Sequence, residues 1–267
     1  MLPTLQDLLG NLMDIGLIIA IYLTLRLLRY QSPDTIPIDN PKREIKLVVV
    51  VALIYILFLF FEFIFLYDIF VVSWLNTFPI YNPYSTGFNM IWISLVSGMD
   101  IVLIYVSMRY TKQSWKSVGI QKIDSWKTLM IGFIPIALIM AGFSFYVLSL
   151  GARFTNDVWI LPRLLYYLIA ATSEELVIRG YIQTRLVSYF GPINGLTIAS
   201  MFFAISHFPV AYLNWGMGNA IETLLFVLLK FTAGLAFGYI YHKTQNIVPG
   251  IILHAFYNWM QDLYIFT

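Results

Sequence analysis

Residues 160–186, ILPRLLYYLIAATSEELVIRGYIQTRL, combine a long apolar run with two adjacent acids and an arginine. A hydrocarbon core of about 30 Å requires roughly 20 predominantly apolar residues per helix, so this segment is long enough to span a membrane. A charged side chain at bilayer depth costs about 2.5–3.5 kcal/mol even on lenient insertion scales. The segment therefore predicts a spanning helix in which Glu174, Glu175 and Arg179 have either a partner or a chemical task.

The composition supports lipid as the solvent of the whole chain. Of its 267 residues, 60% are hydrophobic and 11% are charged, whereas soluble domains carry about 25% charged residues. The net charge of +2, with no basic run, argues against a nucleic-acid partner. Because cysteine is absent, disulfides and a cysteine nucleophile are excluded.

The apolar runs predict an all-α polytopic membrane protein with about eight transmembrane helices. The runs are too long and too uniformly apolar for the alternating strands of a closed barrel. The first run follows no positively charged segment, so we interpret it as a retained span and not a signal peptide. The predicted spans are 9–28, 46–67, 88–108, 128–150, 160–186, 193–208, 220–241 and 247–266.

Basic residues predict the orientation, because cytoplasmic loops are enriched in lysine and arginine. They gather in the connections 26–46 and 109–127, and Arg185 and Lys243 fall on the same side. The opposite side carries Arg153 and Arg163. We therefore expect a multi-pass protein, in the plasma membrane, with both termini outside and the basic loops in the cytoplasm.

Other polar residues in the spans have simpler interpretations. Asp14 and Asp262 fall towards span ends, where water could reach them. Glu62 and Asp100 each stand alone in a span, and for these two we favour helix–helix hydrogen bonds over catalysis.

The spacing of the 174–179 group divides its residues by role. Residues four apart lie on one helical face, so Glu175 and Arg179 are predicted to form an ion pair. Glu174 points elsewhere and keeps an uncommitted carboxylate. Taken alone, the three charges could also serve only to hold helices together.

Two histidines fall within later spans. Phe203 and His207 are spaced i, i+4 in FAISH, and His254 and Asn258 are spaced likewise in HAFYN. Counting about 1.5 Å per residue from the predicted span ends places Glu174, His207 and His254 near mid-membrane, where they can converge.

Such a set supports two hydrolytic chemistries. In one, Glu174 accepts a proton from a water molecule shared with His207, while His254 and Asn258 donate hydrogen bonds to an oxyanion. In the other, Glu174, His207 and His254 bind zinc with an open fourth position. The spacing alone leaves both open.

The motifs EELVIRG, FAISH and HAFYN, in this order on successive predicted helices, resemble the EExxxR, FxxxH and HxxxN motifs of the CPBP intramembrane proteases. This family includes the type II CAAX prenyl endopeptidases and the bacteriocin-processing or Abi-type proteins. The resemblance covers residues 158–264, whose four spans would form the catalytic core. Residues 1–150, the first four spans, carry none of its motifs.

The resemblance implies eight helices around a polar intramembrane cavity and cleavage of a peptide bond in a membrane-associated, possibly prenylated CAAX-like, protein or peptide. It assigns water activation to Glu174 with His207, and the oxyanion side to His254 and Asn258. The supporting positions are Glu175, Arg179 and Phe203.

The family is described both as metalloprotease and as metal-free glutamate-dependent hydrolase. We favour the version without a metal and keep zinc as the alternative. A non-catalytic immunity factor or scaffold is the second reading of the chain, and an ion-coupled transporter is a distant third.

Overall fold

The computed structural model describes residues 3–62, 86–123, 125–215 and 220–265, and most of these are helical. Side chains are described from residue 12 onward in the first helix. The α-helices are α1 (Pro3–Leu27), α2 (Pro41–Phe60), α4 (Thr86–Thr111), α5 (Trp126–Ser149), α6 (Ile160–Glu174), α7 (Thr184–Phe190), α8 (Pro192–Ser206), α9 (Phe208–Trp215), α10 (Ala220–Thr244) and α11 (Ile247–Trp259). The other regular elements of the described residues are short. They are two 3-10 helices, η2 (Trp115–Val118) and η5 (Met260–Leu263), a π-helix, η3 (Glu175–Gln183), and two strands, β1 (Arg153–Phe154) and β2 (Tyr264–Ile265).

Each predicted span coincides with a helix or a run of helices over most of its length, but the last predicted span is helical only to Leu263, because Tyr264–Ile265 form β2. Positions 63–67 and 266 of the predicted spans lie outside the described residues. In the described part of the chain, four helical segments are long and apolar enough to cross a membrane: Met90–Thr111, Trp126–Ser149, Pro192–Ala211 and Ala220–Thr244. The protein is therefore an all-α integral membrane protein, and the count of eight spans stays a prediction.

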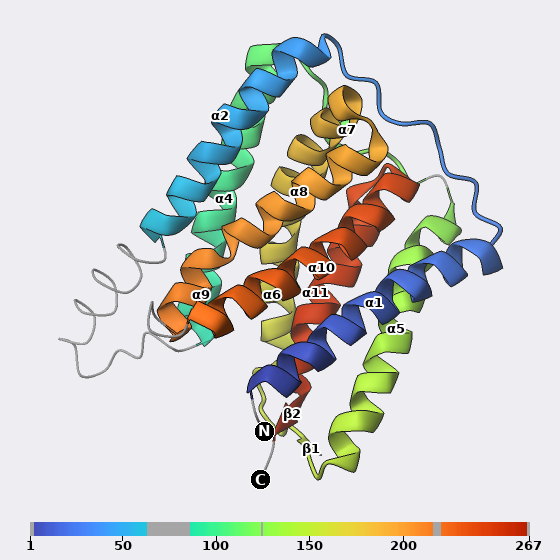
Figure 1. Ribbon diagram of the computed structural model, residues 1–267, viewed down its shortest axis with the longest axis vertical. Helices are drawn as coiled ribbons and strands as arrows, with labels where there is room; N and C mark the ends of the chain where they lie inside the picture. Colours follow the sequence, from blue (N-terminus) through green and yellow to red (C-terminus); the bar gives the residue numbers. More distant parts are fainter. Residues whose placement is uncertain (1–2, 63–85, 124, 216–219, 266–267) are drawn as a thin grey trace.

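The helices form a bundle with two flanks (Figure 1). α2 and α4 pack together on one flank, and α1 and α5 pack together on the other. The helices from α6 to α11 lie between these flanks, with α10 packed against both α1 and α8. The half of the chain that carries the three motifs is thus held between helices of the other half.

A short antiparallel pair, β1 with β2, joins the connection after α5 to the segment after α11. In it, Arg153 is opposite Ile265 and Phe154 is opposite Tyr264. The pair lies at the same end of the bundle as the start of α1 (Figure 1).

The central helix differs from the regular α-helix that the apolar run predicts. It continues from α6 into the π-helix η3 and then into α7, and all nine residues of η3 are buried. Gly180 allows η3 to approach η2, because a Cβ at this position would lie 2.5 Å from the carbonyl oxygen of Val118. π-Helical turns are rare and often occur at functional sites.

Two charged residues lie deeper than the sequence suggests. Asp14, expected near water, is buried and accepts hydrogen bonds from Thr232 Oγ1 and Tyr257 OH, both at 2.7 Å. Arg185, counted among the loop cations, is fully buried, and its Nε donates to Glu44 at 3.1 Å. These contacts join α1 to α10 and α11, and α7 to α2. Both side chains are buried because partners on neighbouring helices satisfy them.

Candidate active site

The junction of α6 and η3 places two adjacent carboxylates in different surroundings. The Glu174 side chain is 27% exposed, whereas that of Glu175 is 1% exposed. Oε2 of Glu174 has no hydrogen-bond partner among the described residues. The expectation that one acid is committed and its neighbour is left free agrees with this arrangement.

Glu175 contacts His254 more closely than it contacts Arg179. Its Oε1 lies 3.0 Å from His254 Nδ1, and its Oε2 lies 3.5 Å from Arg179 Nε. Since a carboxylate accepts, this hydrogen bond places a proton on Nδ1 and fixes the ring. His254 Nε2 then faces Glu174 Oε2 at 3.9 Å. Gly250, on α11 with His254, leaves room for Glu175, because a Cβ at position 250 would lie 2.9 Å from Glu175 Oε2.

The predicted ion pair between Glu175 and Arg179 is confirmed, but it is not the main contact of Arg179. The guanidinium is fully buried, and none of its nitrogens has a hydrogen-bond partner among the described residues. It lies over the ring of Phe203 at 4.6 Å and that of Phe237 at 6.0 Å. The weakly hydrated guanidinium is suited to such stacking.

Phe203 joins the two histidines. Its ring centroid lies 4.6 Å from that of His207 and 5.7 Å from that of His254. Nδ1 of His207 lies 2.8 Å from the carbonyl oxygen of Phe203. Because a carbonyl only accepts, Nδ1 carries the proton, and Nε2 of neutral His207 is left as an acceptor.

The sequence did not single out Phe237. Its ring on α10 stacks on His254 with centroids 4.4 Å apart. It belongs to none of the three motifs, and an aromatic residue in an apolar helix gives no signal that separates such stacking from core packing.

Asn258 lies one turn beyond His254 on α11 and is partly exposed. Within the described ranges it forms no hydrogen bond with Glu174, Glu175 or either histidine. The structure thus brings Glu174 and His254 together directly and His207 through Phe203.

Glu174 lines a cavity of about 220 Å³ between α2, α4 and α6. Neither histidine lines it. Two other acids do: Glu62 from α2 and its continuation, and Asp100 from α4. The sequence favoured a helix–helix hydrogen bond over catalysis for both acids, and for Glu62 this is confirmed, because Trp92 Nε1 on α4 donates to it at 2.7 Å. The fold also gathers both acids around Glu174, which the sequence did not predict. The remaining lining residues are Tyr55, Leu59, Trp92, Ile93, Val96, Tyr166 and Ser173.

The donor geometry does not match a preformed zinc site. In the part of the chain that the structure describes, no three His, Asp or Glu side chains are placed to hold one ion together. Nδ1 of His254 and of His207 are both engaged, so each ring could offer only Nε2.

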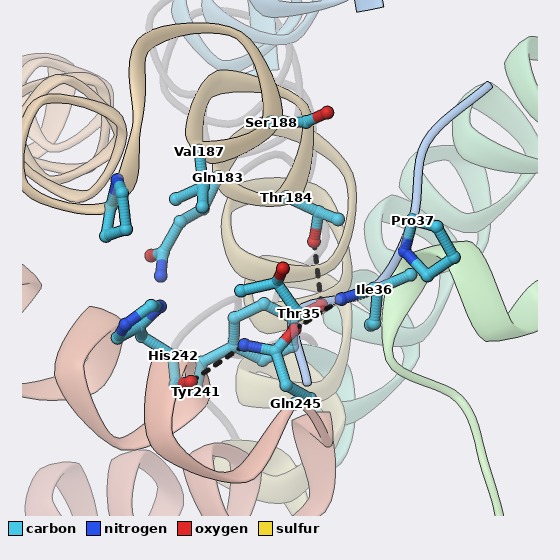
Figure 2. A pocket seen from close by; sticks show the side chains of 11 residues that line it. Thr35, Ile36, Pro37, Gln183, Thr184, Val187, Ser188, Tyr241, His242 and Gln245 are labelled. Atoms are coloured by element: carbon cyan, nitrogen blue, oxygen red, sulfur yellow. Dashed lines mark hydrogen bonds between the residues drawn. The ribbon is translucent and has the colours of Figure 1, made fainter. Parts of the chain in front are cut away.

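A second cavity, of about 250 Å³, lies away from these residues, between the connection after α1, α7 and the end of α10. Figure 2 shows its lining, in which Ile36 N donates to Gln245 Oε1 at 3.0 Å and the hydroxyls of Thr184 and Tyr241 lie 2.7 Å apart. None of the motif residues lines it.

Comparison with known proteins agrees with the motifs. Residues 155–260 match the family described as type II CAAX prenyl endopeptidase Rce1-like. A curated relative, CAAX prenyl protease 2 of Methanococcus maripaludis, is 29% identical over 141 residues, which cover 50% of this chain and 50% of the relative. No solved structure matches. Residues 155–260, which contain all three motifs, are thus similar to the family that the motifs predicted, and the chain spans about half the length of the curated relative it matches.

Proposed function

We propose that the protein is an intramembrane endopeptidase that hydrolyses a peptide bond in a membrane-associated protein or peptide. The position of Glu174 is the main observation behind this proposal. Among the described residues its Oε2 has no hydrogen-bond partner, and its side chain lines a cavity. It also faces His254, which Glu175 orients. The family match and the name of the archaeal relative support the same reaction class.

The chemistry follows from these positions. Glu174 removes a proton from water while the water oxygen bonds to the carbonyl carbon of the substrate. Nε2 of neutral His207 accepts the second hydrogen of that water in a hydrogen bond. The carbonyl becomes an oxyanion, the C–N bond breaks, and Glu174 returns its proton to the leaving amine. The products are one amine and one carboxylic acid, which then releases its proton to water.

The role of His254 in this proposal is to donate a hydrogen bond from Nε2 to the oxyanion. With Nδ1–H donating to Glu175, a neutral ring offers Nε2 as an acceptor, so His254 donates to an oxyanion only as imidazolium. We retain Asn258 as a second donor in this proposal, which requires it to contact the substrate directly.

The two halves of the chain then have different tasks. Residues 158–264 form the catalytic core, and residues 1–150 supply part of the cavity wall. We further propose eight spans in the plasma membrane, with the basic loops in the cytoplasm and both termini outside.

The test is comparative proteomics of cells with the wild type and cells with Glu174→Ala, combined with cleavage by the purified protein. We expect an uncut membrane-associated precursor in the variant, which the purified wild type then cuts and Glu174→Gln does not. Identical proteomes would refute the assignment and favour an immunity factor or scaffold, and precursor cleavage by Glu174→Gln would refute the role of Glu174.

A further inference from the structure

The cavity beside Glu174 contains acceptor atoms without partners. Glu62 and Asp100 are each 3% exposed. Within the described residues, Glu62 Oε2, Asp100 Oδ1 and Glu174 Oε2 make no hydrogen bond. The other oxygen of Glu62 accepts from Trp92 Nε1 at 2.7 Å, which fixes the direction of that carboxyl group. Buried polar atoms of this kind are normally satisfied, so an occupant that donates hydrogen bonds is implied.

The carboxyl groups of Glu62, Asp100 and Glu174 make the cavity suited to a positively charged occupant. Glu62 and Asp100 both lie close enough to Glu174 for their charges to interact. Carboxylates that share a poorly solvated site repel one another unless one takes up a proton or a cation lies between them. Tyr55, Trp92 and Tyr166 add aromatic walls, whose faces also attract cations.

The spacing of these acids selects the kind of cation. No three acids in the described ranges are close enough to coordinate a single metal ion. A guanidinium spreads five N–H donors over a planar fork and offers no acceptor, so it can reach carboxylates that one ion cannot bridge. The volume of about 220 Å³ is below the roughly 300–1,000 Å³ of pockets for drug-sized ligands, and it suits a single long side chain.

We propose that the cavity formed by Glu62, Asp100 and Glu174 is a specificity subsite that binds an arginine side chain of the peptide substrate close to the cleaved bond. This inference rests on the proposed endopeptidase function. It assigns a task to two of the first four spans: α2 and its continuation supply Glu62, α4 supplies Asp100, and both select the substrate that Glu174 cleaves.

The test compares membrane-anchored peptides that differ at one position, where arginine is replaced by citrulline, its uncharged counterpart of nearly equal shape. For the wild type, we expect kcat/KM to be at least tenfold higher for the arginine peptide, as is typical when a hydrogen bond to a charged group is lost. Glu62→Gln and Asp100→Asn should each move this ratio towards one. Glu222→Gln is the matched control, since Glu222 is a partly exposed acid on α10 outside the cavity.

A binding measurement separates this proposal from the catalytic one. The full chain in detergent is titrated with the two peptides carrying a reduced, uncleavable peptide bond. Tighter binding of the arginine peptide, weakened by Glu62→Gln, supports the subsite even if no peptide is cut, in which case only the endopeptidase proposal fails. Cleavage with equal kcat/KM for both peptides overturns the subsite alone, and neither cleavage nor a binding preference overturns both.

Discussion

Glu175 Oε1 lies 3.0 Å from Nδ1 of His254, closer than the 3.5 Å between Glu175 Oε2 and Arg179 Nε. The acid that sequence spacing pairs with an arginine on its own helix is therefore, first of all, the partner of a histidine 79 positions later. The contact joins η3 to α11 and leaves Nε2 of His254 facing Glu174.

This contact predicts a graded loss of activity. Glu175→Ala removes the acceptor of Nδ1–H and frees the ring, so we expect turnover to fall about 10–100-fold, as when carboxylates that orient metal-bound histidines are lost. Glu175→Gln keeps an acceptor of the same shape but loses the charge, and it should retain more activity than Glu175→Ala. Measuring kcat for both variants, and for each combined with His254→Ala, tests the coupling. Fully additive losses in the double variants would show that the two residues act independently.

Glu174 and Arg179 should separate catalysis from folding. Glu174→Gln leaves a partly exposed amide, so the protein should fold with normal yield and fail to cleave. Arg179→Ala removes the buried cation beside Glu175 and leaves His254 as the partner of that carboxylate, so we expect a loss at the lower end of the range for broken buried pairs, about 3 kcal/mol in the free energy of unfolding. Yield and thermal unfolding in detergent, measured beside cleavage, distinguish the two. Normal yield for Arg179→Ala, or cleavage by Glu174→Gln, would reverse the assigned roles.

The buried pair of Arg185 and Glu44 predicts a purely structural effect. Arg185 also donates to the carbonyl and hydroxyl of Ser117 and lies over the ring of Tyr181 at 4.0 Å. Because these contacts survive in Glu44→Ala, we expect a loss at the lower end of the range for broken buried pairs, about 3 kcal/mol. Thermal unfolding in detergent measures it. Asp39→Ala, on the exposed connection before α2, is the control and should leave unfolding unchanged.

The sequence predicted what depends on local pattern. Apolar runs of membrane length predicted the helices, and the i, i+4 spacing predicted the pair of Glu175 and Arg179. It could not predict contacts that depend on how helices pack. The bond from Glu175 to His254 joins helices that the motif spacing does not relate. Phe237 carries no polar signal, and Glu62 and Asp100 appear isolated along the chain because only the approach of α2 and α4 to α6 brings them to Glu174.

The last prediction separates the two hydrolytic chemistries through His254. As a zinc ligand, His254 would be required for metal occupancy, and active protein would contain about one zinc per chain. One feature favours the other role: no three acids or histidines in the described ranges are arranged to share an ion. Loss of His254 should then weaken only transition-state stabilisation.

We therefore expect elemental analysis of active protein to show zinc well below one per chain, with activity that survives a strong chelator. His254→Ala should lose about 10²–10³-fold in turnover and retain a measurable trace, as when one oxyanion donor is removed. Glu174→Ala should retain none, because the group that accepts the proton of water is gone. Stoichiometric zinc that disappears together with activity in His254→Ala, and that restores the chelated wild type when added back, would establish the metalloprotease chemistry instead.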